Sequence, residues 1–207
     1  MITVPEFSQF EWLTHGFGLR DSTLPEDVSA RIRTVRQVHS GIVLDGADEA
    51  GAVRDGDALI SQESGVVVGV KTADCVPILL VDPVTRSVAA VHAGWRGTAA
   101  NIVGNAIRAL QDKFGVRPGD LLAAIGPSIG PCCYEVGPEV GVRFGAQGTG
   151  KTHLNLPFVN EQQLRSAGVK SVWVSGECTF CAAERFFSFR REHERAGRML
   201  SFVGRCQ

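Results

Sequence analysis

The feature that most constrains the fold is a succession of short apolar runs in the first two thirds of the chain. Their apolarity is continuous rather than alternating, and Gly, Asp or Pro residues bound them. Such runs are typical of strands buried on both faces of a sheet. The runs are "IVLD" (42–45), "DALIS" (57–61), "VVVGV" (66–70), "PILLVD" (77–82), "SVAAVHAG" (87–94) and "LLAAIG" (121–126). A later run, "VKSVWVSG" (169–176), predicts a further strand.

Residues 98–114, "TAANIVGNAIRALQDKF", carry apolar side chains at helical spacing, which predicts one amphipathic helix. Thr98 is the expected N-cap, and Gly115 is the expected stop. Together with the strands, this helix favours an α/β or α+β fold in which mixed β-sheets are flanked by helices.

Two more helices are predicted towards the C-terminus. Asn160 followed by Gln163 resembles a capping box, which would open a short helix ending at Gly168. Residues 182–197, "AAERFFSFRREHERAG", are expected to form a helix whose interleaved arginines and glutamates make a solvated face.

Length and composition bound the class of protein. A chain of 207 residues with 44% hydrophobic content is expected to form a single domain, residues 1–207. The net charge of -1, from 21 basic and 22 acidic residues, argues against nucleic-acid or anionic-membrane partners. No segment approaches the ~20 apolar residues of a membrane span, and six cysteines are too sparse for a disulfide scaffold. We therefore expect a cytoplasmic protein, monomeric or homodimeric.

The runs at 77–82 and 87–94 are joined by the turn "DPVTR", which predicts an antiparallel hairpin. If Asp82 pairs with Thr85, Cys75 lies directly opposite His92. A slip of one or two residues in this register would still leave both side chains within reach of one ion.

A third ligand would complete a zinc site, and His39 in "RQVHSG" is the best candidate. Three protein ligands of mixed nitrogen and sulfur type, with one open position, are the pattern of catalytic zinc. The alternative for Cys75 and His92 is an ordinary place in the core, as a small hydrophobe and a hydrogen-bonded imidazole.

Five blocks together resemble the multicopper polyphenol oxidoreductase (laccase-domain) family, which is also described as a YfiH-like purine nucleoside phosphorylase family. They occur in order along the chain and are "RQVHS", "KTADCVPILLVD", "VHAGWRGT", "GPSIGPCCYEVG" and "FFSFRRE...GRML". The resemblance implies a fold similar to that of a toxin deamidase and a catalytic zinc held by His39, Cys75 and His92. The implied activities are phosphorolysis of adenosine, inosine and methylthioadenosine, deamination of adenosine, and copper-dependent oxidation of phenols.

Phosphorolysis requires a bound anion, and the residues after His92 offer a place for it. Backbone N–H groups between Gly94 and Thr98 would lie at a helix N-terminus, whose dipole favours phosphate. Arg96 adds a fork of donors, so Arg96, Gly97 and Thr98 are the predicted phosphate-binding residues. A structural salt bridge is the alternative for Arg96.

Deamination requires a carboxylate that carries a proton near the metal. Asp74, adjacent to a predicted ligand, and Glu135, in the Gly/Pro-rich loop, are the candidates. The usual signature of zinc nucleoside deaminases, H-x-E followed by P-C-x-x-C, is not in the sequence. A four-thiolate site from Cys132, Cys133, Cys178 and Cys181 is a further alternative, although adjacent cysteines chelate one ion poorly.

Two other enzyme classes compete with a zinc-dependent nucleoside phosphorylase that also deaminates adenosine. A copper polyphenol oxidase is disfavoured because a multicopper site needs more ligands than five histidines supply. An amide hydrolase that edits a peptidoglycan precursor would use Cys75 as its nucleophile.

Overall fold

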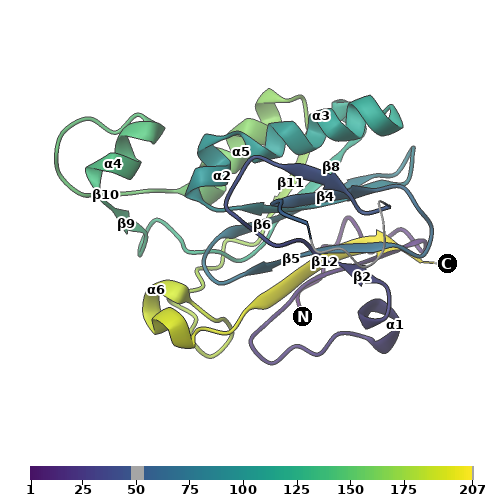
Figure 1. Cartoon of the computed structure of the whole chain (residues 1–207), viewed down its shortest axis with the longest axis horizontal. Helices are drawn as coiled ribbons and strands as arrows, with labels where there is room; N and C mark the ends of the chain where they lie inside the picture. Colours follow the sequence, from purple (N-terminus) through teal and green to yellow (C-terminus); the bar gives the residue numbers. More distant parts are fainter. Residues whose placement is uncertain (48–53, 207) are drawn as a thin grey trace.

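The computed structural model describes residues 1–47 and 54–206. A six-stranded sheet lies between a layer of helices and a four-stranded sheet (Figure 1). Strand order in the six-stranded sheet is β11 (Ser171–Val174), β8 (Leu122–Ile125), β6 (Val76–Asp82), β7 (Ser87–Ala93), β4 (Ala58–Ser61) and β3 (Val43–Asp45). In the four-stranded sheet it is β1 (Leu13–Phe17), β12 (Met199–Arg205), β5 (Val67–Thr72) and β2 (Ile32–Arg33).

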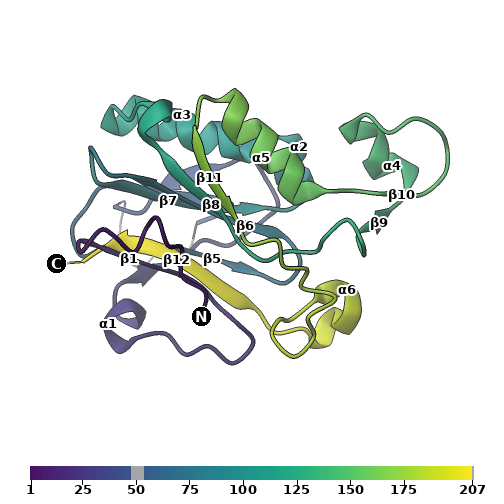
Figure 2. The same ribbon diagram turned by 180° about the vertical axis from the view of Figure 1, so that it is seen from behind.

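Helices cover the outer face of the six-stranded sheet (Figure 2). The helices and remaining strands are α1 (Glu26–Ser29), α2 (Trp95–Ala99), α3 (Ile102–Phe114), β9 (Glu135–Val136), α4 (Pro138–Gly141), β10 (Thr152–His153), α5 (Leu156–Ser166) and α6 (Phe189–Glu192). Short 3-10 turns occupy Pro118–Asp120, Val142–Phe144 and His193–Arg195. Within the described residues, no helix is long and apolar enough to cross a bilayer.

The prediction of mixed sheets flanked by helices is confirmed. Strands β3 and β4, β8 and β11, and β2 and β5 pair in parallel, and the other neighbours in the two large sheets are antiparallel. The seven apolar runs all form strands. Six of these strands belong to the six-stranded sheet, whose coverage on both faces explains their continuous apolarity, and the run at 66–70 forms β5 of the four-stranded sheet.

The hairpin of β6 and β7 shows this double burial most clearly. Ile78 and Val91 point into the core under the helices, whereas Leu79 and Ala90 point into the core between the two sheets. All four side chains are fully buried. Burying a large aliphatic side chain stabilises a fold by about 1.5–3 kcal/mol, so this hairpin is a rigid support for residues at its ends.

The predicted register of this hairpin is wrong by two residues. Pro77, not Cys75, pairs with His92, and Asp82 pairs with Ser87. The cause lies in the turn, where the Asp82 carboxylate accepts hydrogen bonds from the backbone N–H of Val84 and from the Thr85 hydroxyl at 2.7 Å. These bonds hold Thr85 within the loop and exclude it from the ladder.

The predicted single helix over 98–114 is interrupted. Asn101 has a left-handed φ of 54° and separates α2 from α3, and Thr98 lies inside α2 instead of capping a helix. In a continuous helix the Thr98 carbonyl would accept the N–H of residue 102. Here it accepts the N–H of Asn101 at 3.0 Å and the side-chain amide of Gln163 at 2.9 Å, which ends α2.

The capping box predicted at Asn160 is also wrong. Helix α5 begins earlier, at Leu156, because the Asn155 side chain accepts the N–H of Phe158 and caps it. Asn160 is buried in the middle of this helix and donates to the Thr98 hydroxyl at 3.0 Å.

The C-terminal segment predicted as one helix over 182–197 contains only α6 and a 3-10 turn. The Arg191 guanidinium donates to the backbone carbonyls of Thr179, Phe180 and Phe186, and these bonds hold the segment in an irregular path. Arg191 therefore supports the structure and does not belong to a solvated helix face.

Candidate active site

Three predicted metal ligands come together where the central hairpin ends. Cys75 precedes β6, His92 is near the end of β7, and His39 lies in the loop between β2 and β3. One ligand atom from each residue lies within 4.8 Å of the others. The Cys75 Sγ and His39 Nε2 atoms are 4.0 Å apart, and the two imidazole rings meet edge to face with centroids 4.9 Å apart. The two-residue error in register leaves this cluster intact.

Asp57, which sequence analysis did not single out, organises the cluster. Its fully buried carboxylate, just before β4, accepts hydrogen bonds from His92 Nδ1 at 2.8 Å and from the His39 N–H at 3.0 Å. The Ser40 N–H and hydroxyl donate to the same carboxylate at 2.6 and 2.7 Å. One buried anion therefore orients the His92 ring, leaving its Nε2 for the cluster, and fixes the loop that carries His39.

The loop of His39 has a second attachment point. The Gln37 side chain exchanges two hydrogen bonds with the backbone of Lys71, at 2.7 and 2.8 Å. His39 itself has a left-handed φ of 58°, which turns the chain between these two anchors.

The electrostatics of the cluster favour a thiolate beside an imidazolium when no metal is bound. Burial raises the pKa of Cys75, but hydrogen bonds and charge from His39 and His92 outweigh it and lower this pKa to about 6. Burial lowers the pKa of His92, and the Asp57 and Cys75 partners outweigh it, raising this pKa to about 9. Burial also opposes the charge on Asp57, yet bonds from His92 and Ser40 lower its pKa to about 2.

In metal-free protein, the rate of Cys75 alkylation by iodoacetamide is expected to rise as the pH rises through about 6, because the thiolate is the nucleophile. An ordinary thiol would show this rise near its pKa of 9.0. Mass spectrometry of the Cys75 peptide measures the rate separately from the other cysteines. In His39→Gln the rise should move to higher pH, and an unchanged profile in that variant would refute the pairing.

The cluster forms one wall of a cavity of about 390 Å³. The cavity is lined by Val35, Gln37, His39, Lys71, Thr72, Ala73, Cys75, His92, Phe189 and Arg198. Phe189 is 42% exposed, and the Arg198 guanidinium lies 6.0 Å from its ring centroid. Among the described residues no carboxylate pairs with the Lys71 ammonium. The cavity therefore places an aromatic face and two cations beside the three predicted ligands, and sequence analysis predicted neither Phe189 nor Arg198.

Gly94 is the residue that allows the ligands to approach the backbone. A Cβ placed there would lie 3.0 Å from Cys75 Sγ and 3.0 Å from His39 Cδ2. Gly94→Ala is therefore expected to push both ligands apart and to lower zinc affinity by at least about tenfold, as measured by competition with a chelating dye. Gly150→Ala is the control, since a Cβ at Gly150 meets nothing within 4 Å. Equal affinity in the two variants would contradict the prediction.

Asp74 and Glu135, the two predicted proton carriers, occupy different environments. The Asp74 carboxylate accepts hydrogen bonds from the Thr179 hydroxyl at 2.6 Å, the Ser188 hydroxyl at 3.1 Å and the Arg190 N–H at 2.7 Å. These three donors make Asp74 an anchor for the C-terminal loops beside Cys75. Glu135, on β9, is exposed and pairs with Lys151 at 2.7 Å, which lowers its pKa.

Tyr134 is a further polar group near the cluster that sequence analysis missed. Burial raises its pKa to about 12, and the negative charges of Cys75 and Asp74 add to this effect. The Arg190 guanidinium lies 5.3 Å from the ring centroid. The phenol of Tyr134 therefore stays protonated at neutral pH.

The predicted phosphate-binding residues differ in accessibility. Thr98 is fully buried, its hydroxyl accepts from Asn160, and its N–H donates to the Gly94 carbonyl at 2.8 Å. Gly97 is buried as well. Arg96 is exposed, with its guanidinium 4.4 Å from the Trp95 ring centroid. Of the three residues, only Arg96 has a side chain that solvent reaches.

Comparison with known proteins places this arrangement in a family. The family model described as "Multi-copper polyphenol oxidoreductase laccase" matches residues 22–206. Purine nucleoside phosphorylase YlmD from Geobacillus stearothermophilus is 41% identical over 172 residues, covering 76% of this chain and 63% of that protein. The chain thus spans less than two thirds of that relative in this alignment.

Two further matches cover nearly the whole chain. Adenosine deaminase RL5, from an unknown prokaryotic organism, is 35% identical over 205 residues, covering 92% of this chain and 77% of that protein. The crystal structure of YlmD from Geobacillus stearothermophilus superimposes with a TM-score of 0.85 at 30% identity, covering 99% of this chain and 94% of that chain. Because the family model covers residues 22–206, which include His39, Cys75 and His92, and the relatives are 35–41% identical to the chain, the chain belongs to the multicopper polyphenol oxidoreductase laccase family.

Proposed function

We propose that this chain is a zinc-dependent purine nucleoside phosphorylase, acting on adenosine, inosine and methylthioadenosine, with accompanying adenosine deaminase activity. The observation that carries the proposal is the gathering of His39, Cys75 and His92 on the wall of a cavity that also holds Phe189 and two cations. The relatives named as purine nucleoside phosphorylases and adenosine deaminase support the substrate class.

The donor set fits zinc. Two imidazoles and a thiolate leave one position open in a tetrahedral site, which is the composition of catalytic zinc centres. The hydrogen bond from His92 Nδ1 to Asp57 is the carboxylate contact that supports many zinc-bound imidazoles. When bound, zinc would supply Lewis-acid chemistry at this wall of the cavity.

In phosphorolysis, a phosphate oxygen forms a bond to the ribose anomeric carbon while the bond from that carbon to the purine nitrogen breaks. The bonding electrons leave with the purine, which then takes up a proton. Lys71 and Arg198 bring positive charge to the cavity and would hold the phosphate, with Arg96 as a further candidate donor. The Phe189 ring offers an apolar face for the purine.

Other residues would orient the predicted ligands, position the cavity loops and transfer protons. Asp57 orients His92, and Asp74 positions the loop that carries Phe189 through its bonds to Ser188 and Arg190. Glu135 and the protonated Tyr134 are the candidates for moving a proton to or from the purine.

Product analysis tests the proposal directly. Zinc-loaded protein is incubated with adenosine, and in parallel with inosine and methylthioadenosine, with and without phosphate, and the products are separated by liquid chromatography. Adenine and ribose 1-phosphate should form only with phosphate, whereas inosine should form without it. Free ribose and adenine in the absence of phosphate, or no turnover of any of the three nucleosides, would contradict the proposal.

Lys71→Ala is expected to raise the KM for phosphate by about tenfold, because one charged hydrogen bond to the anion is lost. The KM for adenosine in the deaminase reaction, which uses no phosphate, should change much less. Lys170→Ala removes a surface cation near Gly119 and serves as the control. A similar change in both KM values would assign Lys71 to another role.

One specific observation favours a second candidate function. The lowered pKa of Cys75 beside His39 is what a cysteine nucleophile needs, so amide hydrolysis of a peptidoglycan precursor is the alternative. Such activity would disappear on alkylation of Cys75 and survive chelation, whereas the proposed phosphorylase loses activity under both treatments. A copper polyphenol oxidase would instead oxidise phenols after copper loading.

A further inference from the structure

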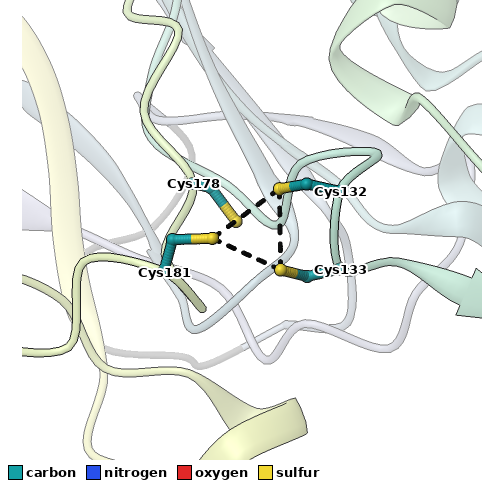
Figure 3. A group of neighbouring side chains, drawn as sticks. All are labelled: Cys132, Cys133, Cys178 and Cys181. Atoms are coloured by element: carbon teal, nitrogen blue, oxygen red, sulfur yellow. Dashed lines mark hydrogen bonds between the residues drawn. The ribbon is translucent and has the colours of Figure 1, made fainter.

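Four cysteines from two loops gather at a second place in the molecule (Figure 3). Cys132 and Cys133 belong to the loop after β8, and Cys178 and Cys181 belong to the loop after β11. All four thiols are free, and their sulfur atoms lie within 4.8 Å of one another. No cysteine of this group belongs to the His39, Cys75 and His92 cluster.

The backbone removes the expected objection that adjacent cysteines chelate one ion poorly. The N–H groups of Cys133 and Tyr134 both donate to the Gly130 carbonyl at 3.0 Å, so residues 131–133 form a single helical turn. Neighbouring side chains on such a turn diverge by about 100°, whereas those of a strand point to opposite faces. The sulfurs of Cys132 and Cys133 are accordingly only 3.5 Å apart.

The second loop has the C-x-x-C spacing of a metal-binding turn. The Ala182 N–H donates to the Cys178 carbonyl at 3.0 Å, which closes a turn and brings Cys181 back towards Cys178. The two loops are joined beside the cluster, since the Thr179 N–H donates to the Ser128 carbonyl at 3.0 Å. Each loop therefore supplies a pair of thiols to one point.

The separations match one tetrahedral ion. Sulfurs around zinc, at a zinc–sulfur distance of about 2.3 Å, lie about 3.8 Å apart. Cys181 Sγ lies 3.7 Å from Cys132 Sγ and 3.4 Å from Cys133 Sγ. A tetrahedral arrangement of four thiolates favours zinc or iron over other metal ions.

Gly130 contributes to the same arrangement. Its N–H points at Cys178 Sγ, 3.2 Å away, as a donor to a thiolate does. A Cβ at this position would lie 3.3 Å from Cys178 Cβ and 3.4 Å from Cys132 Sγ, so glycine allows the two loops to approach without displacing these side chains by a few tenths of an ångström.

We propose that Cys132, Cys133, Cys178 and Cys181 bind one structural zinc ion as four thiolates. A site with four protein ligands has no open position, so this ion would link loops and carry out no chemistry. Binding releases the thiol protons and joins the loops after β8 and β11 into one unit.

The link reaches the active site through Thr179, which lies between two of the proposed ligands. Its hydroxyl donates to the Asp74 carboxylate at 2.6 Å, and the Ile129 N–H donates to the Asp74 carbonyl at 2.9 Å. Asp74 has a left-handed φ of 87° and directly precedes Cys75. The structural ion would therefore hold the two loops that fix this strained residue.

Zinc stoichiometry in a Cys75→Ser background tests the proposal without involving the first cluster. The reduced full-length protein is equilibrated with a zinc buffer, desalted and analysed by elemental mass spectrometry. We expect one equivalent of zinc in Cys75→Ser and none in Cys75→Ser/Cys181→Ser. Cys75→Ser/Cys206→Ser is the matched control and should keep one equivalent, because Cys206 lies outside the group.

Loss of zinc in the control, or equal zinc content in the parent and the Cys181 variant, would overturn the proposal. Failure of the proposed phosphorylase activity would leave this result unchanged, since the readout is metal content alone.

Cobalt titration of the folded Cys75→Ser protein keeps the test independent of how the Cys181 variant folds. Thiolate-to-cobalt charge-transfer bands and intense tetrahedral d–d bands should grow to an end point at one equivalent. The proposal fails if weak octahedral bands appear, if the isolated protein carries an iron–sulfur chromophore, or if its intact mass shows the loss of four hydrogens to two disulfides.

Discussion

His92→Ala is expected to lower kcat/KM for adenosine phosphorolysis by about a thousandfold or more, equivalent to about 4 kcal/mol of transition-state stabilisation. The substitution removes a predicted zinc ligand and leaves Cys75 and His39 unable to hold the ion alone. Initial rates are measured at saturating phosphate, and the zinc content is measured in the same samples. Both measurements use the Cys181→Ser background, which removes the proposed four-cysteine zinc site, and they show whether activity and metal are lost together.

Arg117→Ala is the control for this variant. Arg117 is an exposed residue that pairs with Asp120 and does not line the cavity of the His39, Cys75 and His92 cluster, so its removal should change kcat/KM less than twofold. If His92→Ala keeps activity within tenfold of the parent while the protein remains folded, the three-residue cluster is not the reaction centre.

Asp57→Asn is expected to weaken zinc binding at the active site by about 10–100-fold and to destabilise the metal-free fold by about 2–4 kcal/mol. The carboxylate accepts bonds from three backbone N–H groups, a hydroxyl and the His92 ring. An amide of the same shape would turn its NH₂ group towards some of these donors. Chelator competition gives the affinity, and urea unfolding of metal-free protein gives the stability.

Asp57→Asn should also change how the free energy of unfolding depends on pH under acidic conditions. The pKa of Asp57 is lowered from 3.8 to about 2 in the folded state, so its contribution is present above about pH 3.8 and is lost as the pH falls towards 2. Metal-free parent protein should therefore lose stability over this interval more steeply than Asp57→Asn.

Asp55→Asn is the control for both measurements. Asp55 lies two residues away and forms an exposed ion pair with Arg36, which solvent screens, so its loss should change zinc affinity and stability little. Equal losses in the two variants would show that Asp57 is no more important to the cluster than an exposed carboxylate.

The layered core could be predicted from the sequence because each buried strand has a recognisably apolar composition. Runs such as "PILLVD" and "SVAAVHAG" are apolar at every position, and only a sheet covered on both faces accommodates them. The strands of the second sheet give a weaker signal. In β12, glycine and polar residues interrupt "MLSFVGR", so its place between β1 and β5 depends on partners distant in sequence.

The break in the predicted helix over 98–114 and the irregular path of 182–197 could not be predicted, because side chains distant from those backbone groups in sequence determine them. The break between α2 and α3 depends on Gln163, 65 residues away, binding the Thr98 carbonyl. The helical spacing of apolar residues over 98–114 does not indicate that bond. The same holds for residues 182–197, where Arg191 bonds to carbonyls that the sequence does not bring near it.

The candidate site could be predicted only in part, because some of its residues lie close together in sequence and others do not. Cys75 and His92 lie on one hairpin, so their proximity survived an error of two residues in register. His39 followed from its residue type and from the resemblance. Asp57 and Phe189 left no such signal, because an aspartate before an apolar run and an aromatic residue in a charged segment are both common.

The attachment of the His39 loop by side-chain hydrogen bonds distinguishes His39 from the other two predicted ligands. Cys75 and His92 are fixed by the core hairpin, whereas His39 can detach with its loop. Cys75 and His92 are carried by a hairpin that cannot move without disturbing both cores. His39 belongs to a loop that is held by hydrogen bonds to Asp57, by the Gln37 contact with Lys71 and by the bond from the Asn105 side-chain amide to the Gly41 carbonyl. If an ion binds there as proposed, opening of this loop would free one donor while both sheets stay folded. The rate at which the ion leaves would then be governed by a local event, separable from the global stability of the protein.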